Sequence, residues 1–287
     1  RPWQTHYRLP RTGISFSRIG FGNPQVLGHS WSLAPFLDLP LHKGPRTQLY
    51  GRMSYGLAWI SRPYDPSLNP GNNAIGSHLN NVTSLHLLYE RHIYRQMALR
   101  LGFSAIHHSN GRLLLPNLGL NTFLIRAGIS FGASDLPERA SPLPENPLTR
   151  KFAYALRVGL GGHARSSLDT RPYPVYVVSA MVSRRTGRWS TVFVGWEWSR
   201  DEAFSRTVQA LYAGYELRFG RLAIMTQLQA QIWPLPSGLR FPGQKTGPLV
   251  YLFDPQRAPR WNVFGGIYLK SRQATADYTE LALGVVF

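Results

Sequence analysis

From about residue 12 onward, apolar and polar residues alternate along the chain with a period of two. In residues 191–198 every second residue is Val or Trp, and in residues 222–233 an apolar face lies opposite a face that carries glutamines. Because successive side chains of a strand point to opposite faces, this period predicts β-strands. We find no sustained helical period and no apolar run of about 18 residues, so a membrane-spanning helix is excluded.

Turn residues divide the alternating sequence into segments that we predict to be strands. Their lengths suit a transmembrane barrel, because a tilted strand of roughly 9 to 11 residues crosses a bilayer. With a short segment at 247–253 they give about 14 strands, an even number that lets the last strand close on the first, and 12 is the alternative if weak segments merge. The other predicted strands are 12–22, 29–42, 47–62, 80–93, 96–109, 120–133, 151–164, 173–185, 189–199, 207–219, 221–233, 259–270 and 274–287.

The same alternation would also suit a soluble sandwich, which buries its apolar face. The last residues favour the barrel, since Leu281, Leu283 and Val285 alternate before the terminal Phe287. This pattern resembles the terminal strand by which Gram-negative outer-membrane barrels are recognised for assembly, although an ordinary last strand can also end on Phe. We therefore predict an all-β fold, an antiparallel transmembrane β-barrel, as one outer-membrane domain over residues 1–287.

The amino-acid composition limits the kinds of partner that the protein can bind. The chain has no cysteine, so a disulfide framework and a thiolate metal site are excluded. Its 32 Lys and Arg against 14 Asp and Glu give a net charge of +18, which calls for an anionic partner. No nucleic-acid-binding motif is visible, so we expect a phosphate-bearing membrane surface and no nucleic acid. The chain begins at Arg1 without an apolar leader, and we expect that a signal peptide has been removed.

Short and long connections alternate between the predicted strands, as they do in outer-membrane barrels with short periplasmic turns and longer outer loops. On this assignment strand 96–109 runs outward, and the Pro-rich segment 134–150 is an exception on the periplasmic side. Arginines gather at the short turns, for example Arg188 and Arg221. This Arg-rich periplasmic rim would meet phospholipid phosphates or protein partners, or serve only as soluble turn ends.

A polar cluster lies between strands 96–109 and 120–133. The outward apolar phase of the first strand continues to His107 and Ser109, and that of the second extends back to Asn121. These three side chains therefore project from one outer face, and His108 points the other way. Polar groups that face hydrocarbon are costly without partners, so the cluster predicts either a site or strand ends at headgroup level.

The cluster resembles a known family. H-x-S-N at residues 107–110, followed by P-N-x-G at 116–119, is similar to the motif of the PagL-type lipid A 3-O-deacylases. Those are outer-membrane barrels that hydrolyse an ester-linked acyl chain of lipid A on their lipid-facing wall. Segments 21–28 and 69–80 resemble the longer, acyloxyacyl hydrolase-like members.

The resemblance implies a role for each residue. Ser109 would be the nucleophile and His107 its general base, while Asn117 and backbone N–H groups near Gly111 would stabilise the oxyanion. The family's acidic orienter, a Glu, falls at Asn121. An Asn can orient an imidazole but cannot stabilise the imidazolium by charge.

Three further residues are candidates for substrate binding. Asn110 follows the nucleophile, Arg112 would pair with lipid A phosphates, and His78 lies in an outer loop beside the site, where plain turn structure is the alternative. We expect no cofactor and no metal. Paired histidines invite a metal, but adjacent strand residues point to opposite faces, and no carboxylate lies near in sequence.

The sequence thus predicts an outer-membrane, lipid A deacylase-like serine ester hydrolase of a Gram-negative cell, which releases an acyl chain from lipopolysaccharide. The alternative is a catalytically inactive PagL-like barrel that serves as a lipopolysaccharide-binding or scaffold subunit of an outer-membrane complex. A passive pore is a third hypothesis, and polar and aromatic residues predicted to fill the lumen argue against it.

Overall fold

The described residues form an antiparallel β-structure of 14 strands that follows a short helix, α1 (Pro2–His6). The computed structural model describes residues 2–94, 96–132, 152–169, 171–235, 242–256, 260–273 and 275–287, so the predicted exception at 134–150 lies outside the described residues. Contacts divide the chain into two compact units, Arg1–Asn110 with Pro116–Pro144, and Gly111–Leu115 with Glu145–Phe287. No helix in the described ranges is long and apolar enough to span a membrane.

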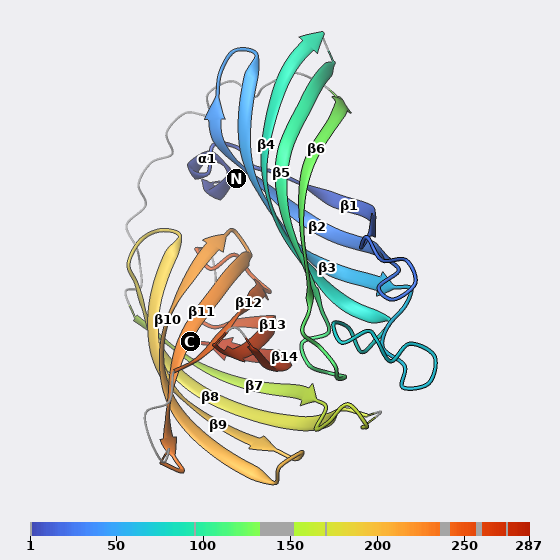
Figure 1. The fold of residues 1–287 in the computed structure, drawn as a ribbon. Coiled ribbons are helices and arrows are strands. Elements are labelled where there is room, and N and C mark those ends of the chain that lie inside the picture. The colour runs from blue at the N-terminus through green and yellow to red at the C-terminus, as the bar shows by residue number, and fades with distance from the viewer. Residues whose placement is uncertain are drawn as a thin grey trace. The chain divides into compact units, whose positions relative to one another are not determined.

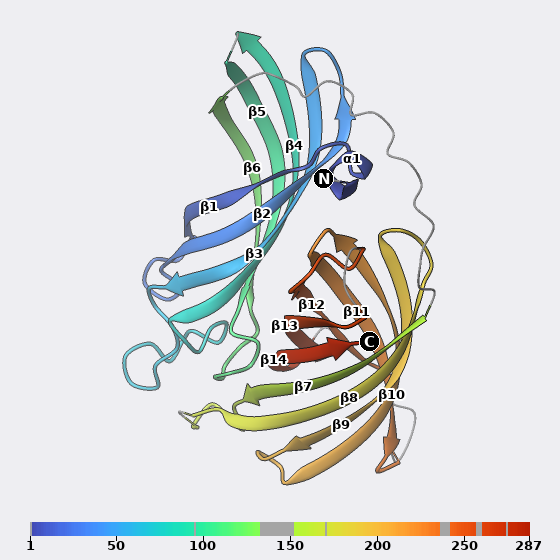
Figure 2. The same cartoon turned by 180° about the vertical axis from the view of Figure 1, so that it is seen from behind.

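The first unit is one six-stranded sheet in which each strand pairs with the next along the chain (Figures 1 and 2). Its outer face is apolar and open, with Leu85, Phe103 and Ile125 exposed by 61%, 53% and 87%. Its inner face buries a cluster that includes Val82 and Ile106. The period of two therefore sorts side chains as the sequence predicted. The strands are β1 (Arg11–Gly20), β2 (His29–Lys43), β3 (Thr47–Ile60), β4 (Leu79–Tyr94), β5 (Met97–Ser109) and β6 (Leu120–Phe131).

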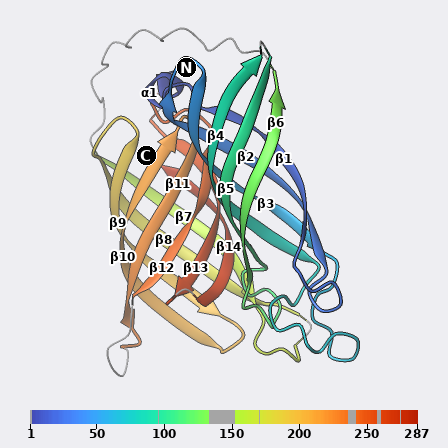
Figure 3. The ribbon, with the colours of Figure 1, turned by 45° about the horizontal axis from the view of Figure 1, so that its top comes forward.

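The second unit is a closed barrel of eight strands, which Figure 3 shows following one another around a ring. The last strand pairs with β7, with Leu283 opposite Val158. The predicted closure of the last strand on the first is therefore wrong, because eight strands already form a barrel whose interior side chains can fill. The strands are β7 (Phe152–His163), β8 (Tyr173–Arg185), β9 (Ser190–Asp201), β10 (Arg206–Phe219), β11 (Leu222–Trp233), β12 (Gly243–Tyr251), β13 (Asn262–Arg272) and β14 (Thr275–Val286).

The predicted count of about 14 strands is confirmed, and the short predicted segment at 247–253 overlaps β12, which begins earlier and ends at Tyr251. The antiparallel all-β class is confirmed as well. Whether the two units act as one barrel domain over residues 1–287 stays a prediction.

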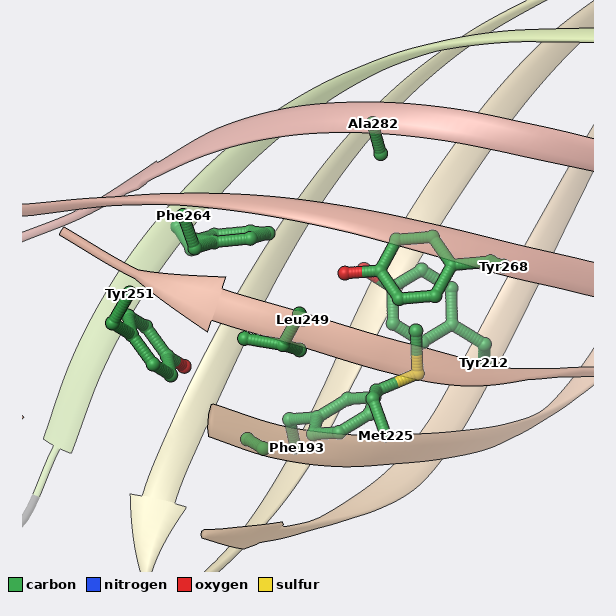
Figure 4. Packing of buried hydrophobic residues seen from close by; sticks show 10 residues of the cluster. Phe193, Tyr212, Met225, Leu249, Tyr251, Phe264, Tyr268 and Ala282 are labelled. Carbon is green, nitrogen blue, oxygen red and sulfur yellow. The ribbon is translucent and has the colours of Figure 1, made fainter. Parts of the chain in front are cut away.

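Aromatic and aliphatic side chains fill part of the barrel interior. Figure 4 shows Phe193, Tyr212, Met225 and Tyr268 packed within one buried cluster. Small residues make room for them, since a Cβ at Gly266 would come 2.5 Å from the Tyr268 ring carbon Cζ. The barrel of the second unit is therefore packed rather than hollow at this level.

Ion pairs also lie on the inner faces of both units. In the first unit Glu90 binds Arg100, and Asp38 accepts from Nε of Arg52 at 2.6 Å. In the second unit Glu197 accepts from Nη2 of Arg157 at 2.7 Å and from Nζ of Lys245 at 2.8 Å. Isolated charges would be costly in such interiors, and each is paired.

Replacing Lys245 by Met should destabilise the barrel by about 3–5 kcal/mol, because Glu197 and Glu280 would lose the buried ammonium that both contact. Urea unfolding in detergent or lipid vesicles measures the change. Arg200→Met is the matched control. Its partner Glu202 and its own side chain are about one third exposed, so the loss should stay below about 1 kcal/mol. Equal losses in the two variants would contradict a specific role for the buried network.

Candidate active site

The candidate site lies on the outer face of the β5–β6 hairpin in the first unit. His107 of β5 stands opposite Asn121 of β6 in the strand register. The Nδ1–H of His107 donates to Oδ1 of Asn121 at 2.7 Å. A neutral imidazole that carries its proton on Nδ1 leaves Nε2 as a proton acceptor. The pair therefore holds the tautomer that a general base needs.

Ser109 lies on the same face two residues further along, at the end of β5. Its Cβ is about 6–7 Å from that of His107 by strand geometry. Asn117 donates from Nδ2 to Oγ of Ser109 at 2.9 Å. The backbone N–H of Asn110 donates to Oδ1 of Asn117 at 3.1 Å, which fixes the orientation of the carboxamide. An N–H donor thus points at the serine oxygen.

Gly119 makes room for the imidazole. Its φ of +80° lies in the left-handed region, and an added Cβ would come 2.6 Å from Cε1 of His107. A side chain at this position would therefore be strained and would displace the base. His108, in contrast, is fully buried on the inner face, where its ring meets Phe21 edge-on at 5.3 Å.

The hairpin loop rests on the loop that follows β3, and both lie at the same end of the sheet (Figures 1 and 2). The N–H of Gly119 donates to the carbonyl of Ala74 at 3.0 Å. Nδ2 of Asn110 donates to Oγ of Ser77 at 2.9 Å. Ala74 and Ile75 are buried in a cluster against which Leu120 packs. The segment 69–80, which the sequence analysis noted for its family resemblance, thus packs against the loop that carries the site and supports it.

Asn72 holds this supporting loop together. Its side chain is fully buried. Oδ1 accepts the N–H groups of Ala74 at 3.0 Å and Ile75 at 3.2 Å, while Nδ2 donates to the carbonyl of Arg62 at 2.7 Å. One carboxamide therefore replaces the backbone pairing that an irregular loop lacks.

The remaining predicted site residues have contacts of their own. His78 stacks on Trp59 with ring centroids 4.6 Å apart, and its Nδ1–H donates to the carbonyl of Ile60 at 2.7 Å. Gly111 and Arg112 belong to the second unit, where the Arg112 carbonyl accepts the N–H of Ala164 at 2.9 Å. Their predicted roles beside Ser109 stay predictions.

Two polar residues of β4 on the same outer face were missed from the sequence. Asn81 stands opposite Ser109, and Thr83 stands opposite His107. The Thr83 hydroxyl donates to Oδ1 of Asn81 at 2.9 Å. The alternation along β4 already places them on the same face as Leu85. Only the register between β4 and β5 shows that they lie beside Ser109 and His107.

An apolar groove of about 370 Å³ opens across β2 to β5 near the site. Leu41, Met53, Leu85, Phe103 and Ala105 are among the residues that line it. Ala105 is two residues from His107 along β5, and Phe103 is two further. The lining residue nearest to the site is Ala105, four residues before Ser109, so the groove begins about 13 Å from Ser109 along the strand.

Two other sequence predictions concern metals and the Arg-rich periplasmic rim. The described residues contain no group of three or more His, Asp or Glu side chains that could hold a metal ion. At the rim, Arg188 donates from Nε to Gln256 at 3.3 Å and Arg221 to the carbonyl of Tyr251 at 2.9 Å. These arginines tie turns of the second unit, and a protein partner there stays a prediction.

The strands, the exposed apolar faces and the paired interior charges define the class of an outer-membrane β-barrel protein. Within that class, residues 1–130 match the family model for Lipid A 3-O-deacylase (PagL). The predicted resemblance to a PagL-type family is thereby confirmed. The match covers nearly the whole sheet of the first unit, which ends at Phe131, and includes His107, Ser109 and Asn121.

Other comparisons add little. A search of curated proteins found no match. Solved structures that are similar include a de novo designed transmembrane β-barrel, with 11% identity over 50% of this chain and 98% of that one and a TM-score of 0.31. The KdgM porin has 8% identity over 97% and 98% of the two chains and a TM-score of 0.22. OccK2 from Pseudomonas aeruginosa has 15% identity over 97% and 95% and the same TM-score of 0.22. Scores of this size support no functional argument.

Asn72→Ala should loosen the supporting loop, because three backbone groups would lose their partner at a cost of roughly 2–3 kcal/mol. Hydrogen exchange should then accelerate at Ala74, Ile75 and Gly119. Asn73→Ala is the control, because Asn73 is exposed and adjacent. Unchanged protection of all three amides would show that Asn72 does not hold the loop.

Proposed function

We propose that this protein is a lipid A deacylase of the outer membrane, a serine ester hydrolase that releases an acyl chain from lipopolysaccharide in a Gram-negative cell. The observation that carries the proposal is the side-chain pairing on the outer wall of the first unit. His107 is oriented by Asn121, and Ser109 receives an N–H from Asn117. The match of residues 1–130 to the lipid A deacylase family supports the substrate.

The proposed reaction begins with proton transfer. Nε2 of His107 takes the proton from Ser109, whose Oγ attacks the acyl carbonyl carbon. The negative charge on the tetrahedral oxygen is stabilised by Nδ2 of Asn117. The intermediate collapses, the sugar oxygen leaves with the proton from His107, and the acyl group stays on Ser109. Water, activated by the same His107, then releases the fatty acid.

The position of the pair suits this substrate. An ester of lipid A lies at the boundary between headgroup and hydrocarbon, where polar side chains on a lipid-facing wall are tolerated. The apolar groove that begins at Ala105 would receive the acyl chain, because it lies farther along the strands from the site. Asn110 and Arg112 remain proposed substrate contacts.

Ser109→Ala should abolish the release of fatty acid, because no other group in the proposed mechanism carries the acyl chain. Mass spectrometry of lipid A from cells with and without the protein measures the loss of one acyl chain. Ser130→Ala is the control, since Ser130 lies near the other end of β6 and outside the site. Unaltered lipid A in cells that contain the intact wild-type protein would contradict the proposed function.

Asn121→Glu should raise the turnover by about tenfold or more, because a carboxylate stabilises the imidazolium of His107 and has no N–H to favour the other tautomer. The initial rate of fatty-acid release measures the gain. Asn121→Gln is the matched control, since it has the same length without the charge and should give no gain. If the rate with Glu did not exceed that with Gln, the position would not work through charge.

The alternative of a catalytically inactive, lipopolysaccharide-binding or scaffold subunit rests on the missing acid at residue 121. It requires that lipid A binds while neither the wild-type protein nor the Asn121→Glu variant releases fatty acid. A stable protein partner that copurifies in stoichiometric amount would support the scaffold role.

A further inference from the structure

A row of aromatic and basic side chains crosses the outer face of the first unit next to the candidate site. Arg18 of β1, Trp31 of β2 and Trp59 of β3 are direct neighbours in the strand register. Trp31 and Trp59 are exposed by 41% and 53%. They are the outward-facing tryptophans among the described residues of this unit. We call Arg18, Trp31, Trp59 and His78 the aromatic row.

Ring stacking orders the aromatic row. The guanidinium of Arg18 lies over Trp31, with its Cζ 5.4 Å from the ring centroid. His78 lies parallel to Trp59 at an interplanar angle of 9°. Phe16 stacks on Trp31 at 5.4 Å. Flat faces are thus held in place on the surface, with a cation at one end.

The charge of Arg18 has no acidic partner in the part of the chain that is described. None of the ion pairs between described residues includes it. An arginine on a lipid-facing wall is costly unless it reaches the headgroup level or meets an anion. Its planar donors match a phosphate, which they can bind with two hydrogen bonds.

The aromatic row also lies at a suitable distance from Ser109. Asn81, the neighbour of Ser109, pairs with Leu57, two residues before Trp59 on the same face. Strand spacing therefore puts Trp59 about 12 Å from Ser109 and Arg18 about 20 Å away. A ligand that extends sideways from the nucleophile would reach the tryptophan faces first and the guanidinium last.

We propose that the aromatic row binds the headgroup of a phosphorylated glycolipid whose acyl ester is at Ser109. The apolar face of a sugar ring stacks on Trp59, and a phosphate at the far end of the headgroup binds Arg18. His78 acts by holding the Trp59 ring. This site rests on the proposed function for the identity of the lipid, and it adds the basis of headgroup recognition.

Tryptophan also anchors barrels at the membrane interface without binding any ligand. If the tryptophans were only anchors, replacing them would change the stability of the protein by the same amount in every lipid. Headgroup binding instead makes affinity depend on the phosphate through Arg18, so selectivity between phosphorylated and dephosphorylated lipid separates the two roles.

The test is a titration of Ser109→Ala protein in nanodiscs with bis-phosphorylated lipid A and with the same lipid freed of phosphate. Adding Arg18→Gln should weaken binding of the phosphorylated lipid by about fivefold to twentyfold and leave the other lipid unchanged. Arg18→Lys should weaken binding of the phosphorylated lipid less, because lysine keeps the positive charge. Trp59→Leu should weaken both lipids.

Two controls match the variants. Arg91→Gln removes an exposed arginine near the other end of β4, and Trp233→Leu removes an exposed tryptophan of the second unit, so neither should alter binding. A difference in gel mobility between heated and unheated samples shows that each variant is folded. The site is contradicted if Arg18→Gln changes both lipids equally or neither, or if phosphatidylglycerol competes as well as lipid A.

Because binding is measured without turnover, the two proposals fail separately. Selective binding through Arg18 by a wild-type protein that never releases fatty acid would contradict the proposed function and leave the headgroup site standing. Fatty-acid release with unchanged selectivity in Arg18→Gln would contradict the headgroup site alone.

Discussion

The structure depends on the cost of placing a polar group on a sheet face that meets hydrocarbon. The outer face of β4, β5 and β6 carries exposed apolar side chains such as Leu85, Phe103 and Ile125, and Thr83, His107 and Asn121 lie on the same face toward one end of the strands. Such groups persist there only with partners, and His107 has Asn121 while Ser109 has Asn117. The same cost that keeps most of the outer face apolar therefore confines its polar, partnered side chains to one end of the strands.

The inner faces meet the same requirement by pairing. Glu197 with Arg157 and Lys245, and Asp38 with Arg52, place charges where water is scarce and satisfy them directly. Small residues accompany these groups, as Gly266 does beside Tyr268. The interior of the second unit is therefore packed, and the candidate site of the first unit lies on an outer face instead.

The candidate site depends on two loops as well as on the hairpin that carries it. Asn72 orders the loop after β3, the carbonyl of Ala74 fixes Gly119, and Gly119 leaves space for His107. The same loop presents His78 to Trp59, so one buried carboxamide supports both the proposed nucleophile and the proposed headgroup site. Because one loop supports both proposed sites, the distance between the bound headgroup and Ser109 is fixed by the same contacts.

The alternation along the chain was enough to predict the strands, the face that each side chain occupies and the common outer face of His107, Ser109 and Asn121. These follow from a period of two, which is local information. The pairing of β14 with β7 could not be predicted in this way, because many distant strands have similar alternation and the folded structure selects among their possible pairings. The folded structure also decided that Asn81 and Thr83 join the site and that Arg18, Trp31 and Trp59 form one row. Strand register sets those neighbours, and no single segment of the chain contains it.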